Sequence, residues 1–240
     1  MTKIQEQFKD PTSLTKWVKI LLVISIIMHI IGVASGFMEY QLLKEIERGV
    51  YRYISDEAFD VIVDKNDMRE MLIGLTQFLL FIIQGIMILM WIFRANKNVR
   101  ALGATNMRFS AGWSVGWYFI PLLTLWKPYQ AMKEIFVKSA ELDSGTELRY
   151  RSLLPIWWTL WIISEVIGRI ILKNTFRDDL DNQGLLNLSL LHQLGDGLDI
   201  FLNVVFLFMV IRLYEQHINC WKRQENPTTI TIDRMIRKGS

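Results

Sequence analysis

The sequence predicts an all-α polytopic membrane protein with four transmembrane helices. Hydrophobic residues make up 51% of the 240 residues, and they come in long blocks instead of recurring at a helical or strand-like period. A helix needs about 20 mostly apolar residues to cross the hydrocarbon core, where backbone groups find no other hydrogen-bond partners. Four blocks meet this length, at residues 17–38, 71–93, 153–172 and 194–213.

The distribution of lysine and arginine predicts the orientation of these spans. The segment between the first two blocks, residues 39–70, holds five Lys and Arg against nine Asp and Glu, whereas the segment after the second block holds nine Lys and Arg. Basic residues concentrate in cytoplasmic segments of membrane proteins. The pattern therefore predicts an acidic, helical extracytoplasmic loop at 39–70, a cytoplasmic segment at 94–152, and both termini in the cytoplasm.

The first block has some features of a signal peptide. Lysines precede it, and Ala34, Ser35 and Gly36 provide the small residues of a cleavage site. Its apolar run is longer than the usual core of about 7–15 residues, so we interpret it as a span.

Residues 111–126 form a fifth apolar segment, which is too short to be a fifth span. Basic residues flank it on both sides, which favours a cytoplasmic segment that is either re-entrant or interfacial. Pro121 interrupts any helix there, and Trp113, Trp117 and Trp126 suit the headgroup level. Residues 129–140 then show the spacing of an amphipathic helix on the membrane surface. The whole region is either a structural platform between spans or a site for a ligand or lipid.

The run of residues 94–100 allows two interpretations. Arg94, Lys97 and Arg100 could anchor the end of the second span in anionic headgroups. Alternatively, Asn96 and Asn98 could cap or orient the segment that follows.

This part of the chain resembles a bacterial membrane family called domain of unknown function 4328. The resemblance depends on Trp91, Arg94, Asn98, Leu102-Gly103, Phe109-Ser110, Gly112-Trp113, Gly116-Trp117, Phe119-Ile120-Pro121, Trp126, Pro128-Tyr129, Met132, Glu134, Trp157-Trp158 and Leu160-Trp161. It covers roughly residues 71–221 and leaves the acidic segment 39–70 unmatched. It implies that the protein is bacterial and has four spans. It does not indicate any activity.

Ionisable and amide side chains inside the spans form a candidate functional site. Such residues are costly in hydrocarbon and often mark function. The predicted cluster contains Gln77, Glu165, Arg169, Asp196, Asp199 and Asn203. Helical rise places most of it at one depth, so we expect Arg169 to pair with Asp199 or Asp196 as well as with Glu165. The excess of carboxylates implies a protonated carboxyl, a bound cation or basic ligand, or an opening to water.

His29 is expected to be a residue of a helix interface, because Gly32 and Gly36 form a GxxxG motif that lets two helices approach closely. The sequence shows no catalytic grouping, phosphate loop or zinc spacing, so we predict no catalytic residue, no metal and no cofactor.

We predict one membrane domain over residues 1–240, with a flexible tail at 222–240, in the bacterial cytoplasmic membrane. The favoured function is a non-catalytic bundle that binds a partner, a lipid or a small ligand; the alternative is a small oligomeric transporter or channel that uses the polar cluster. The expected partners are membrane lipids and a protein partner or a second copy of the chain, but not nucleic acid.

Overall fold

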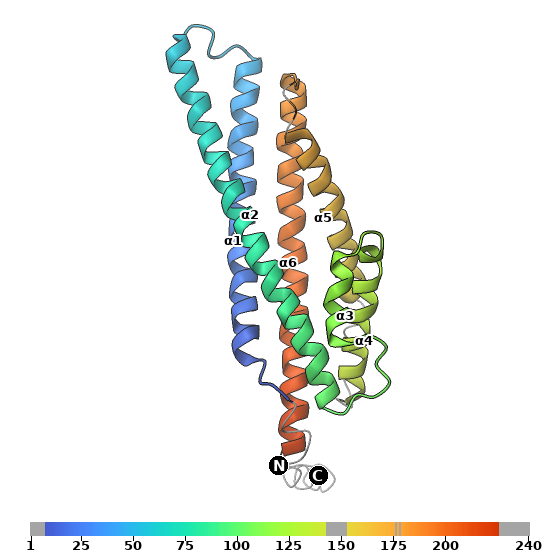
Figure 1. The fold of residues 1–240 in the computed structure, drawn as a ribbon. Coiled ribbons are helices and arrows are strands. Elements are labelled where there is room, and N and C mark those ends of the chain that lie inside the picture. Colours follow the sequence, from blue (N-terminus) through green and yellow to red (C-terminus); the bar gives the residue numbers. More distant parts are fainter. Residues whose placement is uncertain (1–7, 143–152, 176, 178, 226–240) are drawn as a thin grey trace, which may run out of the picture. The chain divides into compact units, whose positions relative to one another are not determined.

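Helices make up almost all of the chain that the computed structural model describes, which is residues 8–142, 153–175, 177 and 179–225. The elements are α1 (Thr12–Glu47), α2 (Asp56–Ala101), α3 (Ala111–Gly116), η1 (Trp117–Phe119), η2 (Leu123–Leu125), α4 (Lys127–Leu142), α5 (Leu153–Thr175) and α6 (Asn182–Glu225) (Figure 1). These described residues contain no strand, so the prediction of an all-α fold is confirmed.

Four helices, α1, α2, α5 and α6, are long and apolar enough to cross a membrane, and each contains one of the predicted spans. The most apolar window of α2 has a mean hydropathy of 2.2, and none of its residues is fully buried inside the protein. Phe78, Leu79 and Phe81 are all more than half exposed there. An apolar surface of this kind would be unfavourable in water and is typical of a helix that faces lipid. The structure therefore indicates a membrane protein.

Three of these helices extend well beyond the predicted spans. With 46 residues, α2 is about 69 Å long, whereas the hydrocarbon core is about 30 Å thick. The predicted loop at 39–70 is consequently mostly helix: α1 continues to Glu47, α2 begins at Asp56, and residues 48–55 form the turn. Likewise, residues 222–225 of the predicted tail continue α6. The rest of that tail and residues 143–152 of the predicted cytoplasmic segment lie outside the described residues.

The chain divides into two compact units, which we describe separately. The described part of unit 1 comprises residues 8–19, 86–142, 153–156 and 207–225; that of unit 2 comprises residues 20–85, 157–175, 177 and 179–206. The helices α1, α2, α5 and α6 contribute residues to both. The single membrane domain over residues 1–240 stays a prediction.

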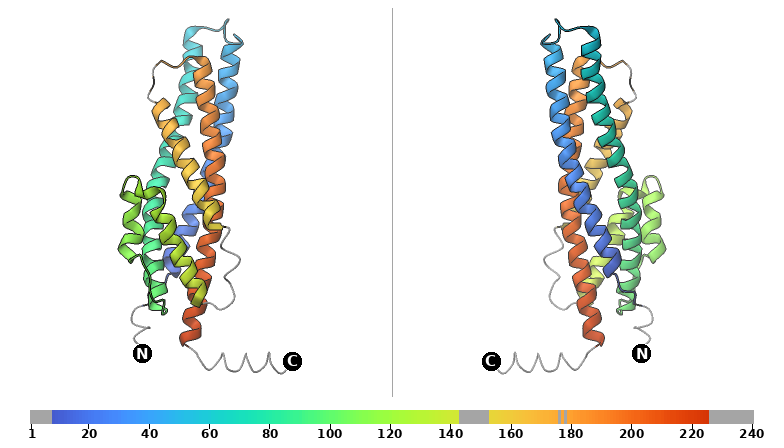
Figure 2. Two further views of the ribbon diagram at one scale, coloured as in Figure 1. Left: turned by 90° about the vertical axis from the view of Figure 1, so that its right-hand side faces the viewer. Right: turned by 90° about the vertical axis from the view of Figure 1, so that its left-hand side faces the viewer.

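Unit 1 has an apolar interior to which α4 contributes one face. Met132 and Ile135 are fully buried and Phe136 is nearly so. The predicted amphipathic helix is thus confirmed as a helix, but its apolar stripe is covered by protein and does not lie on a membrane surface. In both views of Figure 2, α3 and α4 lie beside the C-terminal end of α2.

A buried histidine joins α4 to α6 in this unit. The Nε2 atom of His217 is 2.9 Å from the hydroxyl oxygen of Ser139, which itself donates to the carbonyl oxygen of Ile135. The imidazole must therefore donate from Nε2. Burial lowers the pKa of His217 to about 4, so the folded protein holds this ring in its neutral form at neutral pH.

We expect the stability of the fold to decrease in mild acid because of His217. The unfolded chain, with a histidine pKa of about 6.5, gains this proton before the folded chain does, so stability is complete above about pH 6.5 and decreases toward pH 4. The expected loss between pH 7.5 and pH 5 is about 2 kcal/mol. Thermal unfolding in detergent at both pH values measures it. The loss should become much smaller in His217→Gln and change less in His192→Gln, because burial lowers the pKa of His192 by a smaller amount than that of His217; equal losses in both variants would contradict the prediction.

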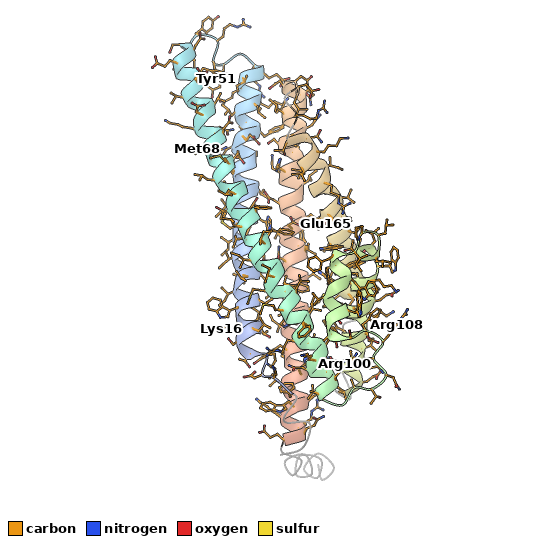
Figure 3. All side chains as sticks on the ribbon, viewed as in Figure 1. Lys16, Tyr51, Met68, Arg100, Arg108 and Glu165 are labelled. Atoms are coloured by element: carbon orange, nitrogen blue, oxygen red, sulfur yellow. The ribbon has the colours of Figure 1, made fainter. Side chains whose placement is uncertain are left out.

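In unit 2, the segments of α1 and α2 form a hairpin closed by the turn at 48–55. The Tyr51 hydroxyl donates to Glu45, and its ring packs against Phe59 with the centroids 6.0 Å apart. Figure 3 labels Tyr51 at this turn and Met68 further along α2. We call the end of unit 2 that carries this turn the turn end.

Candidate functional site

Polar side chains from α1, α2 and α6 meet in the interior of unit 2. The Nδ1 atom of His29 lies 2.7 Å from Asp196 Oδ1, and the Nε2 of Gln77 donates to the same oxygen at 2.9 Å. The side chains of His29 and Asp196 are only 17% and 14% exposed. The carboxylate is thus a double acceptor that connects three helices.

The close approach of α1 to α6 at this point requires a glycine. A Cβ atom on Gly32 would lie 2.2 Å from Asp196 Oδ2 and 2.6 Å from Gln77 Nε2. One helical turn on, the carbonyl oxygen of Gly36 accepts hydrogen bonds from Ser189 and Gln193. The expectation that the GxxxG motif brings two helices close together is confirmed. His29, however, has a carboxylate partner that the sequence did not reveal.

A second layer of polar groups lies farther from the turn end. Ser25 donates to Gln84 Oε1, the Nε2 of Gln84 donates to Asn203 Oδ1 at 2.8 Å, and the Nδ2 of Asn203 donates to the carbonyl oxygen of Asp199 at 2.8 Å. Each amide both donates and accepts, which satisfies groups that hydrocarbon could not.

A third layer lies toward the turn end. Glu70 accepts from the Ser35 hydroxyl and from Arg69 at 3.0 Å, and Arg69 also contacts Asn66. Burial raises the pKa of Glu39, which lies just past the predicted first span, and the nearby Ser189 hydroxyl partly opposes this shift. This layer holds two carboxylates, those of Glu39 and Glu70, and the guanidinium of Arg69.

The three layers repeat every seven residues on each helix. The repeated positions are Ser25, Gly32 and Glu39 in α1; Glu70, Gln77 and Gln84 in α2; and Ser189, Asp196 and Asn203 in α6. A seven-residue spacing keeps one stripe of each helix facing its neighbours, as in a left-handed coiled coil. We call these nine residues and His29 the polar seam. Sequence reasoning found part of it, but missed the shared seven-residue repeat that would have predicted the whole.

The predicted ion pairs of Arg169 are wrong. Within the described residues, Arg169 has no ion pair with Asp196, Asp199 or Glu165, and it is exposed on α5. Asp199 instead accepts a hydrogen bond from Ser164 of α5. Figure 3 labels Glu165 on α5, where it lies within electrostatic range of Arg169 and Asp199. Helical rise gave similar depths, but it does not tell which way a side chain points around the helix axis.

Of the predicted polar cluster, the structure therefore brings together Gln77, Asp196 and Asn203 in the polar seam. Asp199 bridges α6 to α5, while Glu165 and Arg169 lie outside the seam.

In unit 1, buried amides position the segment that follows α2. Asn96 is fully buried; its Nδ2 donates to the carbonyl oxygen of Phe109 at 3.1 Å and to Ser114 Oγ at 2.8 Å, while its Oδ1 accepts from Arg100 Nε at 3.0 Å. Arg100 also donates to Phe109 O at 2.7 Å. Figure 3 marks Arg100 close to the end of α2. Asn96 thus orients α3, the second of the two interpretations of this run.

Asn98 and Glu134 hold backbone in the same way. The side chain of Asn98 accepts from the N–H of Lys9 and donates to its carbonyl oxygen. The Glu134 carboxylate accepts from the backbone N–H groups of Arg108 and Phe109. Arg94 donates to the carbonyl oxygen of Asp10 at 3.3 Å. Sequence reasoning did not assign Glu134 or Arg100 to a site, because no sequence spacing shows which backbone groups they meet.

The remaining predicted motif residues surround an apolar tip between α3 and α4. Trp113 and Trp117 stack with their ring centroids 4.5 Å apart. Ile120 is extended before Pro121, as a residue preceding proline must often be, so the helix stops there. Pro128 is buried in the first turn of α4, where its missing N–H has no cost.

We call Phe119, Leu122, Leu125 and Trp126 the apolar tip. They are 70%, 72%, 45% and 43% exposed. Leu122 has a φ of +65°, a left-handed conformation that favours glycine and is unusual for leucine. A large apolar side chain stands at a strained and exposed position, where glycine would fit better.

The described residues contain no group of three His, Cys, Asp or Glu placed to hold a metal ion. Together, four helices able to cross a membrane and a polar seam between three of them define a helical membrane protein. The chain belongs to the family of domain of unknown function 4328 (DUF4328), whose model matches residues 58–215. The match confirms the resemblance and extends it to residue 58, within the acidic segment that the resemblance left unmatched. No curated protein and no solved structure matches the chain.

Proposed function

We propose that this protein is a non-catalytic integral membrane protein of the bacterial cytoplasmic membrane that binds lipid through the apolar tip between α3 and α4. The observation that carries the proposal is the exposed, strained Leu122. A leucine at positive φ costs roughly 1–2 kcal/mol relative to glycine, and its exposure to water would add an unfavourable apolar surface. Lipid around the tip would remove the cost of the exposed apolar surface, although not the backbone strain.

The charges around the tip support the same proposal. Lys127 follows it directly, and its ammonium group lies 5.6 Å from the centre of the Trp117 ring. Arg100 is exposed in the last turn of α2, and Arg108 is exposed in the segment that joins α2 to α3. Each basic residue near an anionic headgroup adds about 1 kcal/mol of attraction. A tip that enters the acyl region while its flanks stay among headgroups is the interfacial or re-entrant segment predicted from the sequence.

A spin label at residue 122 tests this proposal. In a Cys220→Ser background, a label on Leu122→Cys in liposomes should be relaxed by dissolved oxygen and shielded from a water-soluble nickel complex. A label on Lys133→Cys, on the exposed face of α4, should show the opposite preference. If the label at 122 is as accessible to nickel as the one at 133, the tip lies in water and the proposal fails.

The alternative of a small transporter or channel is supported by the polar seam and not by the arginine cluster first considered. A solute path would include Asp196, Gln77 and Asn203 and leave out Arg169. Flux in proteoliposomes that Asp196→Asn abolishes and Arg169→Gln leaves intact would favour it.

A further inference from the structure

We propose that His29 is a proton-binding site inside unit 2, oriented by Asp196 and Gln77 and loaded from the turn end. This inference goes beyond lipid binding and rests on different residues. It follows from the hydrogen-bond roles at Asp196, from the groups on either side of His29, and from the spacing of the polar seam.

The hydrogen bonds fix which nitrogen of His29 is available. The amide nitrogen of Gln77 can only donate, and it also reaches the carbonyl oxygen of Met28 at 3.4 Å. Asp196 Oδ1 accepts this bond, as an ionised carboxylate does, so His29 donates to it from Nδ1. Of the described residues, none hydrogen-bonds to Nε2 of His29. That nitrogen keeps its lone pair and can accept a proton.

The same geometry favours a proton over a metal cation. Both contacts to Asp196 Oδ1 come from N–H groups, whose positive ends would face a metal ion at that oxygen. Carboxylates and carbonyl oxygens, not N–H donors, surround bound metal cations. An imidazole beside a carboxylate instead becomes a stable ion pair when it gains a proton.

Titratable groups lie on the turn-end side of His29. His192 of α6, one helical turn from Asp196, is within electrostatic range of both Asp196 and Glu70. Glu39 of α1 and Glu70 of α2 form the acidic layer beyond it. The other charged groups near His29 are Asp199 of α6, which is within its electrostatic range, and Glu165 of α5 behind Asp199. In the proposed path, a proton passes from water to His29 by way of these side chains, which gain and lose protons.

On the opposite side, the titratable groups of unit 2 that the structure describes end at Asp199 and Glu165. Beyond His29 lie the amides of Gln84 and Asn203, which neither gain nor lose a proton near neutral pH. The next buried side chains of unit 2 are those of Leu22, Trp157 and Phe206, all apolar. The seam thus ends inside the unit.

The chemical step is the addition of a proton. A proton leaves a hydronium ion and binds Nε2 of His29, which converts a neutral ring beside a carboxylate into an imidazolium–carboxylate pair between α1 and α6.

Histidine ring ¹⁵N spectra of the labelled protein in liposomes test the proposal. His29→Gln identifies the signals. Above the transition, the His29 hydrogen should lie on Nδ1; on acidification from pH 9 to pH 5, the signal of the unprotonated Nε2 should be lost. In Asp196→Asn, this loss should require a solution more acidic by a pH unit or more. Asp64→Asn makes the same change at an exposed site on α2. The pH at which the Nε2 signal is lost should then stay within a few tenths of a pH unit of the wild-type value.

Three results would overturn the proposal. The Nε2 signal could stay unchanged from pH 9 to pH 5, or Asp196→Asn could behave as the wild type does. A pH-sensitive dye inside the liposomes provides the third: proton entry that is faster with wild type than with His29→Gln would mean that the path continues through the protein. Dye traces equal to those of His29→Gln, together with the expected titration, support a one-sided site.

Discussion

Gly32→Ala is expected to lower the free energy of unfolding of unit 2 by about 3 kcal/mol. The added Cβ would lie 2.2 Å from Asp196 Oδ2 and 2.8 Å from its Cγ, far inside van der Waals contact. The short Asp196 side chain is held by His29 and Gln77, so it cannot move aside without breaking both hydrogen bonds. Unfolding by sodium dodecyl sulfate in mixed micelles, followed by circular dichroism, measures the loss.

Gly74→Ala provides the matched control. This glycine lies in α2 of the same unit, and a Cβ there would meet no atom within 4 Å. The change should therefore alter stability by no more than about 1 kcal/mol, in the direction of the higher helix propensity of alanine. Equal effects of the two substitutions would show that loss of glycine itself, and not the contact with α6, causes the change.

A double-mutant cycle identifies the clashing partner. In an Asp196→Ala background two of the three atoms nearest to the new Cβ, Asp196 Oδ2 and Cγ, are gone, so the penalty of Gly32→Ala should decrease by at least about 1 kcal/mol. If the two effects simply add, α1 and α6 do not meet at Gly32 as the structure shows.

The sequence predicted the four apolar helices, because length and hydrophobicity alone decide whether a helix can cross a membrane. It also predicted that Gly32 and Gly36 would face another helix, because small residues four apart have that effect whichever helix is the partner. It did not predict the partner of Asp196. Depth can be counted at 1.5 Å per residue, but the direction of a side chain around the helix axis depends on how neighbouring helices are rotated. This is why Arg169 was expected beside Asp196 although it is exposed on α5.

The shape of the segment after α2 was also only partly predictable. Pro121 predicted the end of a helix, because proline lacks the N–H and restricts the residue before it. No local rule predicted the positive φ of Leu122 or the use of Glu134 as an acceptor for two backbone N–H groups. Both depend on where α4 lies, and that position is set by contacts between residues far apart in the sequence.

Asn96→Ala is expected to destabilise unit 1 by about 3 kcal/mol and to release the segment that carries the apolar tip. The substitution removes two donated bonds and one accepted bond at a site with no exposure to solvent. The Arg100 Nε–H loses its acceptor, and Ser114 Oγ loses a donor. Each buried polar group left without a partner costs about 1–3 kcal/mol. Hydrogen–deuterium exchange over residues 104–126 should increase at least tenfold.

Two further variants separate the hydrogen bonds from the local charge. Lys97→Ala changes the exposed neighbour of Asn96 and should leave exchange over the same residues within about twofold of the wild type. Asn96→Asp keeps the acceptor for Arg100 and adds an ion pair, but removes both donors to Phe109 and Ser114. If the amide donors hold α3 in place, Asn96→Asp should release residues 104–126 nearly as much as alanine does. Protection at the wild-type level in Asn96→Asp would instead assign the anchoring to Arg100, whose second bond to the Phe109 carbonyl would then be sufficient.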